Sequence, residues 1–248
     1  RKRFDTIGGA NIRNIRPEFQ DRFADAKTEL MRRNAKIETA AVQRLTLNDM
    51  SDAAQRASFY EEVMADRPSC CSSKAQMPFK QMGVGQRMVE TISPESPVYD
   101  FLEGRSHFIA WELPRDSASL MLDLRSQSTP STMPGANLLY VFSPAVMLLD
   151  EQFNVIADQQ HGLFAPVSAS IMPVRTASLQ ARISLSGQMD KARYLILYTS
   201  RSIIEGSWRT TRPGVVPIAG GVLPIGTPVG VSLEPSIYGV IEAEIRAQ

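Results

Sequence analysis

The sequence is poor in the residues that most often carry chemistry: its 248 residues include two cysteines, two histidines and two tryptophans. His107 and His161 lie far apart, so a zinc site would need carboxylates or the cysteines brought to them by the fold. The sequence has no Gly-x-Ser-x-Gly elbow, phosphate-binding loop or dinucleotide fingerprint. We therefore expect no catalytic residue, no metal and no cofactor, although a carboxylate pair that meets only in the fold would escape this test.

The charges give no sign of a nucleic-acid partner. Lys and Arg number 27 against 26 Asp and Glu, so the chain lacks the positive field that binds phosphate backbones. The longest uncharged run, 213–233, contains four prolines and five glycines and cannot form a membrane-spanning helix. We expect a β-rich loop there. Because the sequence opens at Arg1 and not at a methionine, we also expect an exported protein whose signal peptide has been removed.

Proline is scarce in the first quarter of the chain, which predicts an N-terminal tail and helical arm over residues 1–67. Only one of the 16 prolines lies there, at Pro17, where it suits the first turn of a helix. Apolar residues follow at helical spacing and need a cover, either from the rest of the chain or from a partner. This docking stripe consists of Phe19, Phe23, Leu30, Ile37 and Leu45. Asn48 suits the N-cap of a second helix that Pro68 must end, so the arm is one helix or a helical hairpin.

After Cys71 the apolar residues recur with a period of two, which is typical of strands with one buried face. The alternation covers 118–125, 178–185 and 241–246. The runs 138–142 and 194–199 are apolar on both faces, as in central strands. Further strands are expected at 78–82, 106–113, 145–149 and 154–157, with a turn at 150–152. The pattern predicts a mainly β domain over 68–248, an antiparallel, jelly-roll-like β-sandwich.

The tryptophans differ in their expected roles. Trp111 lies on the apolar side of a strand pattern, so we expect it to be buried. Trp208 lies in a polar segment, expected to be a loop, beside Arg209 and Arg212, whose guanidinium groups donate hydrogen bonds. An indole ring can stack on the flat face of a sugar while neighbouring donors bind its hydroxyl groups, so this segment could contact a sugar. These three residues are the candidate ligand contacts, and the alternative is that Trp208 packs over the edge of the sandwich.

Several segments resemble the maltose operon periplasmic protein family, MalM, in their order and spacing. The segments are LYVFSPAVMLLDEQFNV at 139–155, ARYLILYTS at 192–200, and YGVIEAEI at 238–245 after a Pro-Val-Gly at 228–230. The segments 70–80, 96–101 and 108–114 also resemble the start of that domain. The resemblance spans about residues 69–248. It implies a secreted, periplasmic, β-rich protein that in some members is linked to maltodextrin uptake, and it transfers no catalytic position.

The adjacent Cys70 and Cys71 mark the junction between the helical and the strand-like parts. The pair has three possible states: a vicinal disulfide between the two residues, two free thiols, or bonds to other chains. Redox activity and metal binding are further alternatives. We prefer the vicinal disulfide, a local staple, because an oxidising periplasm favours disulfides. No apolar run precedes Cys70, so we expect no lipid anchor on it.

Our functional hypothesis is a noncatalytic periplasmic scaffold or binding protein, an accessory subunit of a cell-envelope complex. It would dock onto envelope proteins, or onto further copies of itself, through the N-terminal helices. The alternative is a maltodextrin- or glycan-binding accessory protein of carbohydrate uptake. We expect a periplasmic location, with association to the outer membrane left open, no nucleic-acid partner and no transmembrane segment.

Overall fold

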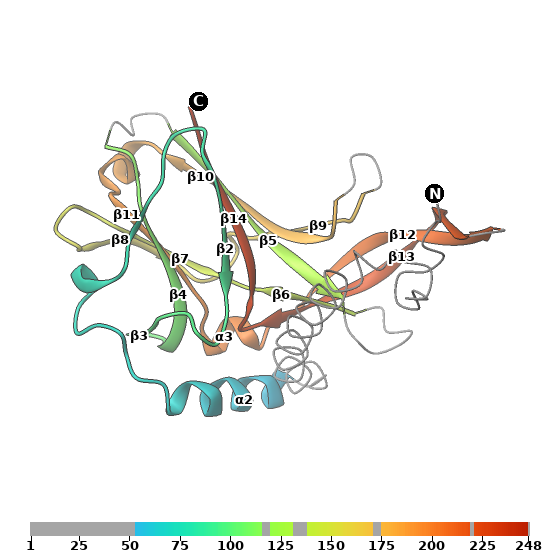
Figure 1. Ribbon diagram of the computed structural model, residues 1–248, viewed down its shortest axis with the longest axis horizontal. Helices are drawn as coiled ribbons and strands as arrows, with labels where there is room; N and C mark the ends of the chain where they lie inside the picture. Colours follow the sequence, from blue (N-terminus) through green and yellow to red (C-terminus); the bar gives the residue numbers. More distant parts are fainter. Residues whose placement is uncertain (1–52, 116–119, 131–137, 171–174, 219–220, 248) are drawn as a thin grey trace, which may run out of the picture. The chain divides into compact units, whose positions relative to one another are not determined.

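The computed structural model describes residues 53–115, 120–130, 138–170, 175–218 and 221–247 (Figure 1). They all belong to one compact unit, Met50–Gln248. The docking stripe and the first expected helix lie outside the described residues, and the domain boundary expected after residue 67 stays a prediction. The described elements are α2 (Ala53–Ala65), η2 (Lys74–Gln76), β1 (Lys80–Gln81), β2 (Arg87–Ile92), β3 (Val98–Phe101), β4 (Gly104–Glu112), β5 (Leu120–Pro130), β6 (Leu138–Phe142), β7 (Ala145–Leu149), β8 (Val155–Gln159), β9 (Ala165–Val167), β10 (Ser178–Leu185), η3 (Gly187–Lys191), β11 (Tyr194–Tyr198), α3 (Arg201–Ile204), β12 (Trp208–Ile218), β13 (Gly221–Ser236) and β14 (Gly239–Ala247).

The described residues are mainly β, as the sequence predicts, and their strands form two sheets. A six-stranded sheet runs β1-β4-β11-β7-β8, with β3 also paired to β4. An eight-stranded sheet runs β12-β13-β6-β5-β10-β9, with β14 paired to both β5 and β2. The expectation of purely antiparallel sheets is wrong, because β1 runs parallel to β4 and β13 runs parallel to β6. These pairs join strands far apart in the chain, where no tight hairpin fixes the direction.

The alternating patterns locate strands with one buried face. In β5, Leu122 and Leu124 are at most 1% exposed, and in β14 Ile241 and Ile245 are fully buried. The predicted alternation at 178–185 forms β10, whose leucines are also buried. The doubly apolar runs form β6 and β11, and all five residues of β7 are buried. Both faces of the six-stranded sheet are therefore covered at its centre.

The run 213–233, expected to be a β-rich loop, instead forms most of a long hairpin. β12 pairs with β13 from Trp208↔Leu233 to Ile218↔Gly221, with register shifts on either side of Gly214. Only the last residues of β13, Ser232–Ser236, also pair with β6. Prolines are tolerated in a two-stranded ribbon because many backbone amides there need no hydrogen-bond partner. So many prolines in one segment lead the sequence analysis to predict a loop instead of strands. The sequence pattern also fails to predict three strands that the structure contains, β2, β3 and β9.

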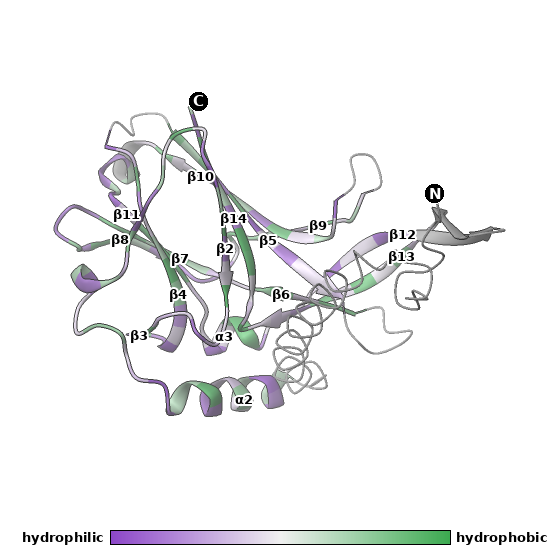
Figure 2. Cartoon of the chain, in the orientation of Figure 1, coloured by the Kyte–Doolittle hydropathy of each residue, from purple (hydrophilic) through white to green (hydrophobic). Residues whose placement is uncertain are grey.

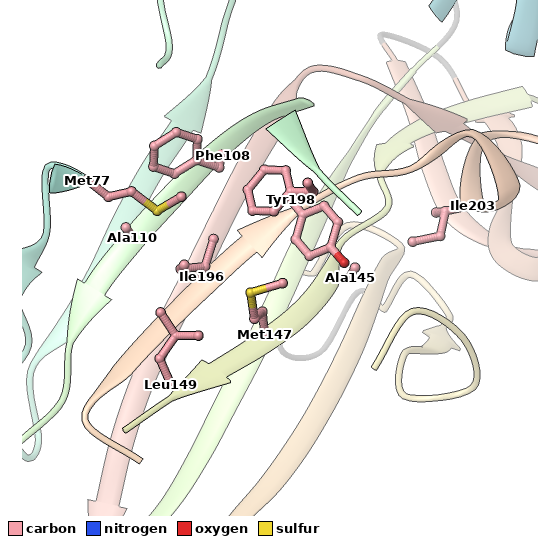
Figure 3. Close-up of a cluster of buried hydrophobic side chains, with 10 residues drawn as sticks. Met77, Phe108, Ala110, Ala145, Met147, Leu149, Ile196, Tyr198 and Ile203 are labelled. Atoms are coloured by element: carbon pink, nitrogen blue, oxygen red, sulfur yellow. The ribbon is translucent and has the colours of Figure 1, made fainter. Parts of the chain in front are cut away.

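One face of the six-stranded sheet carries a dense apolar cluster (Figure 3). Its strand residues are Phe108, Ala110, Ala145, Met147, Leu149, Ile196 and Tyr198. The chain segment after the cysteine pair covers it: Met77 is buried in the cluster, and Cys71 and Phe79 pack against it. Phe101 of β3 stacks on Tyr198, with ring centroids 4.0 Å apart and an interplanar angle of 11°. Residues that precede β4 thus cover part of this face, and Ile203 of α3 is also buried in the cluster.

The turn predicted at 150–152 is confirmed, and it orients an aromatic ring. The Asp150 carboxylate accepts hydrogen bonds from the backbone amides of Gln152 and Asn154, each at 2.8 Å. These bonds lower the pKa of Asp150 below its ordinary value, with the Asn154 side chain as the largest cause. Phe153 adopts φ 63°, and its ring stacks on Tyr194 with centroids 4.5 Å apart. The turn therefore extends the cover of the apolar cluster.

The eight-stranded sheet curls until the two ends of its main path meet. β9 and β12 are the terminal strands of that path, yet the Ala169 amide, just after β9, donates to the Thr211 carbonyl of β12 at 3.1 Å. The Ser168 hydroxyl lies 3.0 Å from the Thr211 hydroxyl. Val141, Ala177, Leu179 and Leu233 form a buried cluster, with Trp208 and Phe164 packed against it. We call this arrangement the strand ring.

The second helix expected from Asn48 to Pro68 is confirmed over α2, which packs on the strands. Its buried face contains Arg56, Ala57, Tyr60 and Met64, and Figure 2 shows polar and apolar residues side by side along it. The Tyr60 hydroxyl donates to the Arg105 carbonyl at 2.6 Å. Burial raises the pKa of Tyr60 to about 12, so the phenol keeps its proton at neutral pH. The helix is thus fixed to β4.

The contact between Gly239 and Phe142 predicts a steric effect on stability. A Cβ atom on Gly239 would lie 2.8 Å from the Cβ of Phe142. Gly239→Ala should therefore lower the free energy of unfolding by about 1–3 kcal/mol, measured by urea denaturation. Gly230→Ala is the matched control, because its added Cβ would meet nothing within 4 Å. Equal losses for both variants would contradict the close approach.

Candidate functional site

A cavity of about 230 Å³ lies where the start of β12 approaches the turn between β6 and β7. Five parts of the chain line it: the β6–β7 turn, the loop before β9, β10, α3, and the segment that leads into β12. The lining combines apolar side chains, such as Phe164 and Leu179, with hydroxyl, amide and imidazole groups. Ligand sites typically combine apolar and aromatic walls with a small number of polar groups that orient the ligand, and this lining has groups of both kinds.

Trp208 forms one wall of the cavity and also packs on the buried cluster of the strand ring. It is the first residue of β12, not a loop residue as expected from the sequence, and it is partly buried. A Cβ placed on Gly206 would lie 4.0 Å from the indole Cη2 atom and 3.2 Å from the Ile203 carbonyl oxygen. The ring therefore lies close to the chain segment that precedes it. This places an aromatic surface at the cavity.

Ser143 lines the same cavity from the turn between β6 and β7. It is 2% exposed, and its hydroxyl has no hydrogen-bond partner among the described residues. A buried hydroxyl without a partner costs about 1–3 kcal/mol, and the oxygen of Ser143 is itself almost completely enclosed. The turn is well fixed, because the Ser126 hydroxyl donates to the Phe142 carbonyl at 2.5 Å.

The remaining polar lining groups lie nearer the surface. His161 and Ser207 are exposed, and Gln160 is partly buried. Ser202 is exposed and its hydroxyl lies 3.0 Å from that of Ser200. Together with Ser143 they offer hydroxyl groups, an amide and an imidazole, all of which both donate and accept hydrogen bonds. Uncharged groups of this kind match the hydroxyl groups of a sugar.

Arg56 of α2 bonds to the segment before Trp208, which forms part of the cavity wall. Its side chain is 3% exposed and donates to the Ile204 carbonyl at 3.2 Å and the Gly206 carbonyl at 3.1 Å. It also forms an ion pair with Glu234 of β13 at 3.2 Å. A buried charge needs such partners, so α2, the segment before Trp208 and β13 are tied to one guanidinium group. No sequence pattern points to this role, because an arginine on an amphipathic helix is normally solvated.

The other candidate residues lie outside the cavity. Arg209 and Arg212 are exposed and do not line it, so their part in ligand contact stays a prediction. Cys70 and Cys71 form a disulfide in this structure, with Cys70 exposed and Cys71 packed on the cluster of the six-stranded sheet. The sequence prediction missed Ser143, whose only signal was its place in a strand turn.

The two histidines are not brought together. His107 is 1% exposed and its Nδ1 lies 2.8 Å from the Ser96 carbonyl, whereas His161 is exposed at the cavity. Among the described residues no group of three or more His, Cys, Asp or Glu side chains is arranged to hold a metal. Within the same part of the chain, no helix has the length and hydropathy of a membrane span.

The fold and the cavity define the class: a mainly β protein of two mixed sheets with a small polar cavity beside a strand ring. The family model described as "Maltose operon periplasmic protein precursor (MalM)" matches residues 103–214. This confirms the MalM-like assignment for the middle of the span expected from the sequence. The match includes every residue that lines the cavity. Neither the curated proteins nor the solved structures contain a match to this chain.

The buried His107 predicts a pH dependence of stability. Burial lowers its pKa below the ordinary value of 6.5, so the unfolded chain binds a proton at a higher pH than the folded chain does. The stability contribution is fully present above pH 6.5 and is lost as the pH falls towards the folded pKa, by at most about 1.4 kcal/mol per pH unit.

Urea denaturation between pH 7.5 and 5 measures this slope. His107→Gln should flatten it, whereas His161→Gln, at an exposed position, should leave it unchanged. The same slope in wild type and His107→Gln would contradict the assignment.

Proposed function

We propose that this chain is a noncatalytic periplasmic binding protein associated with maltodextrin use, and that its cavity beside Trp208 binds a sugar unit. The observation that carries this proposal is the partly buried indole of Trp208, which forms one wall of a cavity that hydroxyl and amide side chains also line. In this proposal the two sheets act as a sandwich scaffold that fixes the cavity. The periplasmic setting rests on the description of the matched family.

The chemistry of the lining supports a carbohydrate in particular. A pyranose presents an apolar face of C–H groups and a rim of hydroxyl groups, so it needs both an aromatic surface and neutral hydrogen-bonding groups. Trp208 and Phe164 supply the first, and Gln160, Ser202 and Ser207 supply the second. No Asp or Glu lines this cavity, so it lacks the carboxylate pair that glycoside hydrolysis uses. Binding without turnover is the function that fits these residues.

The wall formed by Trp208 predicts a loss of affinity on its truncation. Trp208→Ala should weaken the binding of maltotriose at least about tenfold, which corresponds to about 1.4 kcal/mol, because the sugar loses its aromatic contact. Isothermal titration calorimetry of the full chain measures this effect. Trp208→Phe should retain part of the affinity.

Leu102→Ala is the control for that titration, because Leu102 is 92% exposed and lies outside the cavity lining. Arg209→Ala and Arg212→Ala test the remaining sequence hypothesis in the same experiment. Absence of heat with maltotriose and longer maltodextrins, from wild type that melts cooperatively, would overturn the proposed function.

A second candidate function, an accessory subunit of an envelope complex, is favoured by the anchoring of α2. The Arg56 ion pair and the Tyr60 hydrogen bond fix this helix to the strands, so the chain before residue 53 is attached to a firm base. We propose that the docking stripe of Phe19, Phe23, Leu30, Ile37 and Leu45 binds an envelope protein or a further copy of this chain. Association of this kind is compatible with sugar binding.

The docking stripe predicts a change in assembly when it is made polar. Leu30→Asp with Ile37→Asp should lower the mass measured by light scattering after size-exclusion chromatography, or remove envelope proteins cross-linked to the full chain in cells. Glu29→Lys with Lys36→Glu changes neighbouring charges but leaves the apolar stripe intact, and should have neither effect. A monomer for all three proteins, together with identical cross-links, would contradict docking through the stripe.

A further inference from the structure

We infer that Arg56 is a positioning residue of the proposed sugar site, because it fixes the backbone that carries the Trp208 wall. This role rests on the proposed function and adds to it, since it makes the affinity for the ligand depend on α2. Within the described chain, the cavity lining includes no residue of α2. The helix therefore acts on the site only through the segment that it binds.

The segment between β11 and β12 has little regular structure of its own. Its helix α3 spans only Arg201–Ile204, and residues 206–207 belong to no helix or strand. Yet this segment lines the cavity with four residues before it enters β12 at Trp208. Carbonyl groups at the end of a helix find no partner within that helix. The position of this wall therefore depends on partners from other parts of the chain.

Arg56 provides such partners with all three nitrogen atoms of its guanidinium group. The Nε atom donates to the Ile204 carbonyl at 3.2 Å, and the Nη2 atom donates to the Gly206 carbonyl at 3.1 Å. The Nη1 atom lies 3.2 Å from the carboxylate of Glu234 on β13. Because the guanidinium group is planar and its donors keep a fixed geometry, these three groups are held at set positions relative to one another.

The register of β12 with β13 closes these contacts into a loop around Trp208. Trp208 pairs with Leu233, and Glu234 is the next residue of β13. On the other side, Gly206 is bound two residues before Trp208. Arg56 thus links the chain just before the indole to the strand just after its cross-strand partner. This link sets the angle at which the chain enters β12, and with it the place of the indole.

The other printed contacts between α2 and this segment are less suited to the role. Arg201 forms an ion pair with Glu61 at 2.6 Å, but both side chains are more than half exposed, and exposed pairs contribute little. The Tyr60 hydroxyl donates to the Thr199 carbonyl at 3.3 Å, at the opposite end of the segment. Arg56, by contrast, is 3% exposed, so water competes little for its bonds.

Two variants that conserve charge test this role. Arg56→Lys replaces the planar guanidinium group with a single ammonium group, and Glu234→Asp shortens the acidic side chain. Each should weaken the binding of maltotriose by about threefold to tenfold, measured by isothermal titration calorimetry of the full chain. If one variant does not melt cooperatively, the other decides.

The same two variants should change the fluorescence of the free protein. Without sugar, acrylamide should quench the emission of Trp208 more strongly than in wild type, because the indole is less firmly packed. Trp111 is fully buried and should contribute little to this difference. A loss of stability alone would not give this signal in a protein that remains folded.

Met64→Ala is the matched control, since Met64 is buried on the same face of α2 as Arg56 and lies outside the cavity lining. It should lower the melting temperature, because it leaves a cavity in the core. Its affinity for maltotriose and its quenching should remain those of wild type. An equal loss of affinity in Met64→Ala and Arg56→Lys would overturn the positioning role.

The outcomes separate this role from the proposed function. Unchanged affinity, or unchanged quenching, in both charge-conserving variants would overturn the role of Arg56 and leave the proposed function standing. If wild type does not bind maltotriose, the proposed function fails, and the dependence of affinity on α2 fails with it. Quenching of the free protein would then still report whether Arg56 fixes the indole.

Discussion

The buried guanidinium of Arg56 is the interaction on which the geometry of the site depends. One side chain bonds to two carbonyl groups of the segment before Trp208 and to the carboxylate of Glu234. Three pieces of chain that are distant in sequence thereby share one charge, and a shift of any of them breaks a contact with that guanidinium group. Removing one partner of such a buried pair typically costs about 3–5 kcal/mol. The arrangement makes α2 a structural support of the cavity and not a separate appendage.

The cavity follows from the way the eight-stranded sheet curls. Because β9 approaches β12, the inner face of the sheet closes round a small apolar cluster, and Trp208 packs against that cluster. The turn between β6 and β7, fixed by Ser126 and by the close approach of Gly239 to Phe142, brings Ser143 to the same place. The six-stranded sheet is stabilised separately, by the segment with Met77 and Phe79 that covers its apolar cluster. Ile203 of α3 belongs to that cluster and also lines the cavity, so the two parts of the core meet at α3.

The sequence predicts the strands well where burial alternates and poorly where it does not. β5, β10 and β14 follow from a period of two, and β6 and β11 from continuous apolar runs. The hairpin of β12 and β13 is hidden by its prolines, and the parallel pairing of β13 with β6 depends on contacts that no local pattern contains. For the site, Trp208 is found from its residue type. Ser143 and Arg56 are not, because their importance comes from burial and from partners far away in the chain.

The central claim is that Trp208 lies against a bound sugar. Because the chain has two tryptophans, their fluorescence tests this contact directly. Trp111 is fully buried, whereas Trp208 is only partly buried at the cavity. Acrylamide quenching of tryptophan fluorescence should therefore report mainly on Trp208. With saturating maltotriose, we predict a blue shift of the emission and a marked fall in the quenching constant. Unchanged emission and unchanged quenching across the same titration would contradict it.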